Sequence, residues 1–292
     1  MNLWNCSGIK VLSKKDTEKF YSKEFLVKIG NIKQLYLNKK RNEALEELQK
    51  ITEEGLNSSE KGMRRNLIGV ILFSKGSFEQ AIFNFEFALQ ETMEDKLLQA
   101  RILLNLSSSY YKLGLFDKAF NTQENISTNY LIGAEKSKYH ILRYKLAKEL
   151  GKDREEIVSL IEILGKHNSL TTLKQNKYYQ VLINNFFKLS KSEKMRLLEQ
   201  FENRELLCVG YLGYLEVEKL YYKGQKEDAK DIISWLSNEY SNNKEVSALV
   251  SAFTFRLENY AKMSPSNIGL VIPLSGDRSK YGQRVLRGVD TG

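Results

Sequence analysis

The chain has 292 residues, a formal net charge of +9 and only two prolines, Pro265 and Pro273. The long proline-free stretch before Pro265 favours a helical array, because proline breaks helix interiors. The basic residues are spread along the chain, so the charge indicates a solvated surface that suits acidic partners or an anionic membrane and does not specify nucleic acid. No apolar run reaches about 18 residues, which excludes a transmembrane helix within this sequence.

The cysteines and histidines show no pattern of a metal site or of catalysis. Cys6, Cys208, His140 and His167 are the complete set, and no pair has the CxxC or HxxxH spacing that metal sites use. We therefore expect no metal, no cofactor and no catalytic residue, and so a protein that is not an enzyme. Cys208 lies in an apolar run and is predicted to be a core residue, whereas His140 is predicted to pack between helices.

Residues 1–15 look irregular and contain a lone cysteine. Cys6 is followed by Ser7 and Gly8, and this string resembles the start of a mature bacterial lipoprotein. The hydrophobic stretch that should precede it is absent, and Asn5 departs from the small residue that is usual before the cysteine. The resemblance implies that Cys6 carries a lipid and anchors the protein to a membrane.

From residue 16 onward the pattern predicts helical hairpins, and the clearest unit spans residues 65–88. It reads as helix, short turn and helix, with small residues where the helices cross and a glycine in the turn. The unit resembles a tetratricopeptide repeat at Gly69, Leu72, Gly76, Phe78, Ala81, Phe85 and Ala88. Small residues let the two helices approach closely, and the two phenylalanines are predicted to fill the gap between neighbouring units.

The same pattern recurs along the chain. It is marked, in chain order, by Leu35, Ala44, Leu48, Ile51, Gly114, Phe116, Ala119, Gly151, Met195, Gly224 and Ala229. Met195 stands at the alanine position of a degenerate unit over residues 177–201. The pattern gives six hairpins, followed by one amphipathic helix over 244–262 that suits a terminal cap. The predicted fold is therefore an all-α, right-handed tetratricopeptide-like helical-hairpin solenoid over residues 16–263.

The first helices present aromatic residues at one inner-face position of the repeat. This twelfth position of each unit holds Tyr36, Phe73, Tyr111, Lys148, Phe187 and Tyr221. Two interpretations are open, a groove with aromatic anchors for an extended partner segment or ordinary packing between adjacent first helices. Tyr211, Tyr214 and Tyr222 lie on or near the same face, and they either join such a contact patch or cover the cap helix.

Two asparagines also project inward, Asn66 and Asn105. In tetratricopeptide domains that bind chaperones, asparagines and lysines clamp a C-terminal carboxylate. The spacing here does not reproduce that clamp, so these asparagines are not assigned a ligand.

After Met263 the composition changes. Residues 264–267 read as a linker, residues 268–273 as a short buried strand ended by proline, and residues 280–289 as the start of a helix. The string resembles the opening of a type I periplasmic binding domain in residues 268–276, Tyr281, Gly282, Gln283 and Gly288. The resemblance implies that Ser275 and Gly276 face a ligand cleft, of which residues 264–292 supply only a short α/β stub.

Helical repeats followed by such a domain resemble the outer-membrane lipoproteins that activate penicillin-binding proteins. The resemblance implies a non-catalytic protein-interaction scaffold, periplasmic and anchored to the outer membrane, that regulates peptidoglycan synthesis through a penicillin-binding protein. Two other interpretations stay open. The repeats are the helical extension of a solute-binding protein for amino-acid-like ligands in transport or sensing, or the chain is a cytoplasmic tetratricopeptide adaptor.

Overall fold

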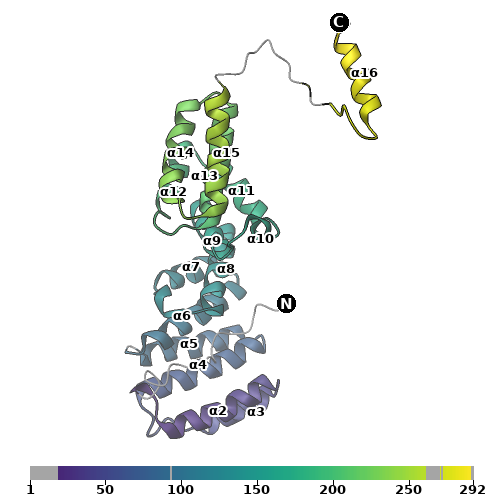
Figure 1. Cartoon of the computed structure of the whole chain (residues 1–292). Helices are drawn as coiled ribbons and strands as arrows, with labels where there is room; N and C mark the ends of the chain where they lie inside the picture. The colour runs from purple at the N-terminus through teal and green to yellow at the C-terminus, as the bar shows by residue number, and fades with distance from the viewer. Residues whose placement is uncertain (1–18, 93, 261–269, 271, 291–292) are drawn as a thin grey trace. The chain divides into compact units, whose positions relative to one another are not determined.

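The computed structural model describes residues 19–92, 94–260, 270 and 272–290. Every regular element in this part of the chain is a helix, so the predicted all-α class is confirmed there (Figure 1). The chain divides into two compact units, one up to Leu212 and one from Gly213, and each is described by itself. No helix among the described residues is long and apolar enough to cross a membrane.

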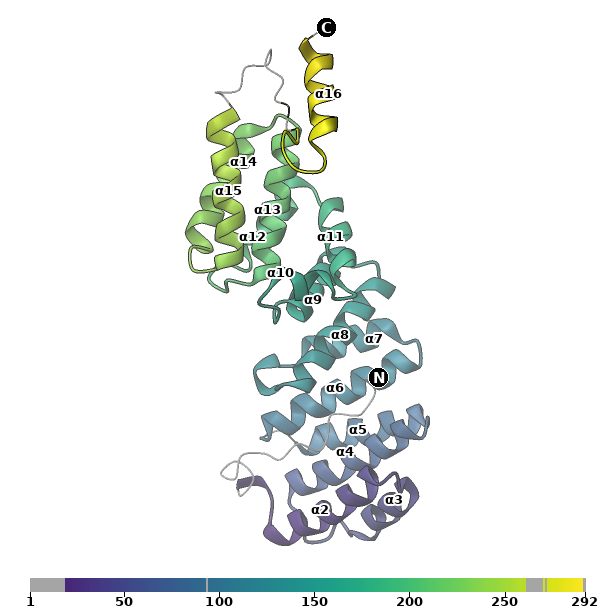
Figure 2. The same ribbon diagram turned by 45° about the vertical axis from the view of Figure 1, so that its right-hand side comes forward.

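The first unit is a succession of helix pairs. Its main helices are α2 (Lys23–Leu37), α3 (Arg41–Lys50), α4 (Ser58–Ser74), α5 (Phe78–Glu91), α6 (Lys96–Lys112), α7 (Phe116–Glu124), α8 (Ala134–Glu149), α9 (Asp153–Leu164), α11 (Tyr179–Lys188) and α12 (Lys191–Glu199). Two short helices lie between pairs, η1 (Thr128–Tyr130) and α10 (Leu170–Lys174). From α2 to α9 each helix packs against the next, as Figures 1 and 2 show.

The second unit holds three further helices, and α13 (Leu207–Tyr222) spans the boundary between the units. The later helices are α14 (Lys226–Glu239), α15 (Lys244–Tyr260) and α16 (Ser279–Asp290). The cap helix predicted over 244–262 is present as α15, which packs against α14. The helix predicted from residue 280 is present as α16. Of the strand predicted over 268–273, the described residues 270, 272 and 273 carry no regular structure, and the rest lies outside the described residues.

The first helix of a pair ends in one recurrent turn. In this turn a backbone N–H donates to the carbonyl oxygen of the residue five positions earlier. Examples are the bonds from Ser77 N–H to the Leu72 oxygen and from Leu115 N–H to the Tyr110 oxygen, both at 3.0 Å. The residue before that amide has a positive φ in all five of these turns, at Lys39, Gly76, Gly114, Gly151 and Gly224. Four of the five are glycines, because a side chain in this left-handed conformation costs about 1 kcal/mol.

The turn sets the start of the second helix in five pairs, and the Ser190 cap sets it in the pair of α11 and α12. The fourth residue of the second helix is, in chain order, Ala44, Ala81, Ala119, Glu156, Lys194 and Ala229, at intervals of 37, 38, 37, 38 and 35 residues. All six side chains are buried, and the four alanines are fully so. The predicted alanine positions are therefore correct, because only a small side chain fits at a close helix crossing.

The assignment of Met195 to the alanine position is wrong by one residue. Helix α12 starts after Ser190, whose side chain accepts from the backbone N–H of Glu193 in a capping box. Lys194 is therefore the fourth residue and is buried, whereas Met195 is only half-buried. The Lys194 Nζ lies 5.5 Å and 5.1 Å from the ring centres of Phe186 and Phe187. The aliphatic part of the lysine side chain therefore fills the helix crossing, and its ammonium group faces two aromatic rings.

The small residue Gly69 is required by a ring on the neighbouring helix. A Cβ added to Gly69 would lie 2.6 Å from the ring of Phe85, closer than side chains pack. Phe85 is fully buried and also belongs to a core cluster with Leu98 and Ile102 of α6. The phenylalanine therefore fills the space within its own pair as well as the predicted gap between neighbouring pairs.

We predict that replacing Ala81 by leucine lowers the free energy of unfolding by about 1 to 3 kcal/mol, because the larger side chain overpacks a fully buried helix crossing. Chemical denaturation measures the change. The matched control is Gln80→Leu, which places the same side chain at an exposed position of the same turn. Equal unfolding midpoints for the two variants would show that the crossing does not lie at Ala81.

Candidate functional site

The predicted aromatic row lies on the first helices of the pairs, and its members in the first unit are largely packed. Phe73 is buried, and Tyr36, Tyr111 and Phe187 are half-buried. The Phe73 ring lies 5.3 Å from that of Phe78, while Tyr111 lies 5.5 Å from Phe116. Both are contacts with the start of the second helix in the same pair. Phe73 and Tyr111 therefore each join the two helices of their own pair, while Tyr36, Tyr111 and Phe187 stay partly exposed.

Tyr211 is buried at the start of α13. Its ring lies 6.4 Å from that of Tyr179 on α11, and the Nζ of Lys174 lies 4.9 Å from its centre. Burial, together with a hydrogen bond between the two tyrosines, raises the pKa of Tyr179 to about 12. The Tyr179 phenol therefore stays neutral at physiological pH, and Tyr211 acts here as a packing residue.

Two of the three remaining predicted tyrosines meet at one phenylalanine in the second unit. Tyr214 is buried and Tyr221 half-buried, and their rings lie edge-on to Phe253 of α15 at 6.1 Å and 5.3 Å. Tyr222 is 75% exposed, and its ring lies 5.5 Å from that of Tyr221. Tyr214 and Tyr221 therefore pack against the cap helix α15, which is one of the two predicted interpretations, whereas Tyr222 lies on the surface.

A polar row that the sequence did not reveal as a unit runs along the first helices α4, α6 and α8. The Asn105 Nδ2 donates to the Oδ1 of Asn66 at 3.2 Å, and the Lys138 Nζ lies 3.5 Å from the Asn105 Oδ1. Both asparagines are buried, and the Nδ2 of Asn66 has no hydrogen-bond partner in the described part of the chain. The two asparagines predicted to face inward thus bond to each other.

One turn nearer the helix starts, the same helices share a buried ion pair. The Nε of Arg101 on α6 donates to the Oε1 of Glu135 on α8 at 2.8 Å, with both side chains about 5% exposed (4% and 6%). Next to it the Tyr21 hydroxyl donates to Asp95, the residue before α6. Burial and this hydrogen bond to a carboxylate raise the pKa of Tyr21. Tyr21 and Asp95 are 74 residues apart, so only the folded chain brings them together.

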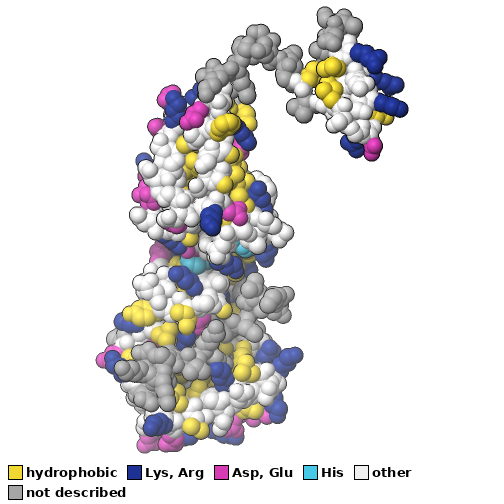
Figure 3. All heavy atoms as spheres, viewed as in Figure 1, with side chains coloured by type: hydrophobic (Ala, Val, Ile, Leu, Met, Phe, Trp, Pro, Cys, Tyr) yellow, Lys and Arg dark blue, Asp and Glu magenta, His cyan; other side chains and the backbone are white. Residues whose placement is uncertain are grey.

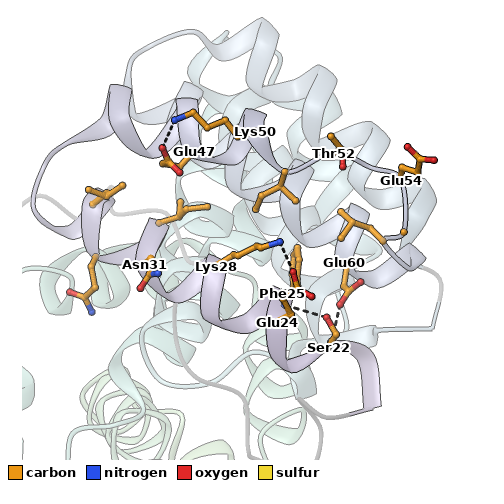
Figure 4. A pocket seen from close by; sticks show the side chains of 16 residues that line it. Ser22, Glu24, Phe25, Lys28, Asn31, Glu47, Lys50, Thr52, Glu54 and Glu60 are labelled. Atoms are coloured by element: carbon orange, nitrogen blue, oxygen red, sulfur yellow. Dashed lines mark hydrogen bonds and ion pairs between the residues drawn. The ribbon is translucent and has the colours of Figure 1, made fainter.

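A cleft of about 730 Å³ lies on the first pair, between α2, α3 and the loop that leads to α4 (Figure 4). Its floor is apolar, formed by Phe25, Ile32, Leu35, Ile51 and Leu56. Its edge holds two ion pairs, Lys28 with Glu24 at 2.7 Å and Lys50 with Glu47 at 2.6 Å. At one end the buried Glu60 accepts from the Ser22 backbone N–H at 2.7 Å. The cleft therefore offers an apolar floor with a mixed charged edge.

A smaller polar cleft of about 300 Å³ lies along α8 and α9 and includes His140. Beside it, Arg204 donates to both carboxylate oxygens of Glu162 at 2.6 Å and 3.0 Å. Burial alone would raise the pKa of Glu162, but these bonds outweigh it and leave the pKa below its ordinary value. Burial lowers the pKa of His140, whose Nε2 has no hydrogen-bond partner among the described residues. The histidine packs against α9, as predicted.

The remaining predicted site residues lie near the chain ends. Ser275 and Gly276 are exposed in the loop before α16, where Gly276 has a positive φ. The loop folds back on the helix, since a Cβ on Gly282 would meet the Pro273 carbonyl oxygen. Cys6 lies outside the described residues. Cys208 is a buried free thiol in the core, as predicted, and burial raises its pKa to about 12.

Charge is dispersed over the face of the molecule that Figure 3 shows. In Figure 3 the lysine and arginine side chains are scattered over the visible face, mixed with acidic ones, as the sequence predicted. On α16 the basic side chains lie on one side and hydrophobic side chains on another. A dispersed distribution gives weak long-range attraction and leaves specific contacts to grooves and exposed rings.

We predict that Glu135→Ala lowers the free energy of unfolding by about 3 kcal/mol or more, because it leaves the Arg101 guanidinium buried without its counter-charge. The control is the double variant Arg101→Met with Glu135→Leu, which removes both charges and should recover most of the loss. Urea unfolding measures both. A loss below about 1 kcal/mol for the single variant would mean that water reaches the pair.

We predict that stability falls as the pH drops from about 7.5 to about 5.5. The folded protein keeps His140 neutral, whereas the unfolded chain takes up a proton below about pH 6.5. The stabilisation is therefore complete above that pH and is lost as the pH falls toward the folded pKa. Denaturation midpoints at several pH values measure the slope, which His140→Asn should reduce. His167, whose pKa burial also lowers, should contribute to the remaining slope. An unchanged slope in His140→Asn would contradict the assignment.

Comparison with known proteins adds no assignment. No family model matches the chain, and no curated protein matches its sequence. Function is therefore inferred from the repeat positions, the tail string and the surfaces described above.

Proposed function

We propose that this chain is a non-catalytic protein-interaction scaffold, the tetratricopeptide-like part of a periplasmic, outer-membrane lipoprotein that regulates peptidoglycan synthesis. The observation that carries the scaffold proposal is the repetition of one turn and one helix crossing. The crossing position recurs at intervals of 35 to 38 residues in six pairs, and the turn recurs in five of them. Regular stacking of such pairs supports a right-handed solenoid, a fold that binds proteins through its extended surfaces.

The tail supports the more specific part of the proposal. The helix that begins at Ser279 and the tight loop at Gly276 agree with the opening of a type I periplasmic binding domain. Repeats followed by that domain suggest the activators of penicillin-binding proteins. In this proposal the partner is a penicillin-binding protein, and no nucleic acid or metal takes part.

The half-buried rings Tyr36, Tyr111 and Phe187 are the members of the aromatic row that suit a partner contact. Each is half-buried, and ring contacts with Phe116 and Phe186 hold Tyr111 and Phe187 in place. Rigid aromatic side chains lose little conformational entropy on binding, and they therefore dominate many interfaces. Phe73 of the row and the nearby Tyr211 and Tyr214 are buried and pack against neighbouring helices.

We predict that the chain binds a purified penicillin-binding protein from the same organism and that Tyr111→Ala weakens this binding about tenfold, the loss expected for an anchor ring at an interface. Surface plasmon resonance measures the affinity. The matched control is Tyr130→Ala, which removes a 43% exposed tyrosine outside the row and should leave the affinity unchanged. An equal loss in both variants, or no binding by the unaltered chain, contradicts the proposal.

We predict further that the protein expressed with its native upstream region reaches the membrane fraction and that Cys6→Ala moves it to the soluble fraction. Removing the thiol removes the attachment point of the lipid, and stable anchoring requires more than one acyl chain. Fractionation followed by immunoblotting gives the distribution, with Cys208→Ala as the control for loss of a cysteine. A Cys6→Ala protein that stays in the membrane fraction would rule out anchoring through Cys6.

A further inference from the structure

A second groove, of about 680 Å³, runs over α4 between α3 and α5. Its floor is formed by Leu45 of α3 together with Ile68 and Leu72 of α4, and Phe83 of α5 forms one wall. None of the aromatic-row residues lines it. The groove is therefore a surface separate from the aromatic row.

Two phenylalanines of α5 are exposed, Phe83 in the wall of this groove and Phe87 beside it. Phe83 is 55% exposed and Phe87 is 41% exposed, and their ring centres lie 4.7 Å apart. The guanidinium carbon of Arg65 lies 5.2 Å from the centre of the Phe87 ring. One exposed apolar side chain is ordinary, but an adjacent aromatic pair with a stacked arginine has the composition of interface anchors.

The two ends of the groove differ in charge. Arg64 and Arg65 both contact the single carboxylate of Glu53, at 3.1 Å and 2.7 Å, so this end carries one excess positive charge. Glu79, two turns before Phe87 on α5, is exposed at the other end. The short turn between α4 and α5 makes these helices antiparallel, which places the arginines beside Phe87 and Glu79 beside Leu72. The charged ends are about 12 Å apart, from eight residues of helix rise.

The walls of the groove determine the backbone form of an occupant. All three walls are helices, whose backbone N–H and C=O groups are bonded along their own chain. The walls therefore offer no edge to which a strand could pair, which favours a ligand whose backbone groups are bonded within its own chain. An α-helix is such a ligand.

We propose that this groove binds an amphipathic helix of a partner protein. The helix places apolar side chains at i, i+4 and i+7 on the floor and against Phe83, with a carboxylate at the end facing Arg64 and Arg65 and a lysine or arginine at the end facing Glu79. The inference rests on the proposed scaffold function, but it places the contact on the α3–α5 side and not on the aromatic row. The complementary charges set the direction of the bound helix.

The test uses the full chain and a displayed library of helices about 15 residues long. The helices share apolar residues at i, i+4 and i+7 and carry glutamate, lysine or glutamine at each end. We expect enrichment of helices with glutamate at one end and lysine about two turns away, in one orientation only. For a synthetic peptide of that sequence, Phe83→Ala and Phe87→Ala should each weaken binding about tenfold, as measured by fluorescence anisotropy.

Two further variants separate the charge from the apolar contact. Arg65→Gln should lower the affinity for the peptide that ends in glutamate about threefold or more, and it should leave the affinity for the peptide that ends in glutamine unchanged. Phe255→Ala, which removes a 67% exposed phenylalanine on α15, is the matched control and should bind like the unaltered chain. Because Phe83, Phe87 and Phe255 are all partly exposed, thermal melts should show all three variants folded.

Three outcomes would overturn the inference. The first is no enriched helix, and the second is a peptide whose affinity Phe83→Ala leaves unchanged. The third is self-association of the unaltered chain that Phe83→Ala abolishes, since the occupant would then be a second copy. Tyr111→Ala separates this test from that of the scaffold proposal. If it weakens binding to the penicillin-binding protein while the library yields no groove ligand, the scaffold proposal stands and the groove inference fails.

Discussion

The close crossing of the two helices in each pair is the constraint on which the rest of the structure depends. A left-handed residue such as Gly76 ends the first helix and sets the start of the second, so that the fourth residue of the second helix meets the first helix. Alanine at that point, as at Ala81 and Ala119, lets the backbones approach until large rings such as Phe85 fill the space beside them.

The fourth and fifth pairs meet the same constraint with charged side chains. At the crossing of the fourth pair stands Glu156, whose carboxylate accepts a hydrogen bond at 2.8 Å from Asn185 of the next pair. In the fifth pair Lys194 lies over two phenylalanine rings. Each charged group finds a compensating partner, which a buried charge requires. Because these two crossing residues are not alanine, the repeat pattern is weak in the sequence of the fourth and fifth pairs.

Regular stacking of the pairs also decides where polar groups gather. Because α4, α6 and α8 occupy equivalent places, Asn66 meets Asn105, and Arg101 meets Glu135 one turn away. Groups of this kind hold neighbouring pairs in one register, since any slip would bury an uncompensated charge. On the other side of the same pairs, the second helices leave α4 uncovered along the groove beside Phe83. One packing rule thus produces a buried polar row and an open groove with an apolar floor.

The sequence by itself determined the helices, the glycine turns and the alanine crossings, because these depend on local backbone conformation and on a spacing that repeats along the chain. It also identified Cys208 as a core residue and α16 as a helix. It placed the fifth crossing one residue too late, because the cap at Ser190 and not the average spacing sets the start of α12. Contacts such as Tyr21 with Asp95, 74 residues apart, and the exposure of Phe83 were decided only by the tertiary structure, because both depend on which helices lie beside one another and on what they leave uncovered.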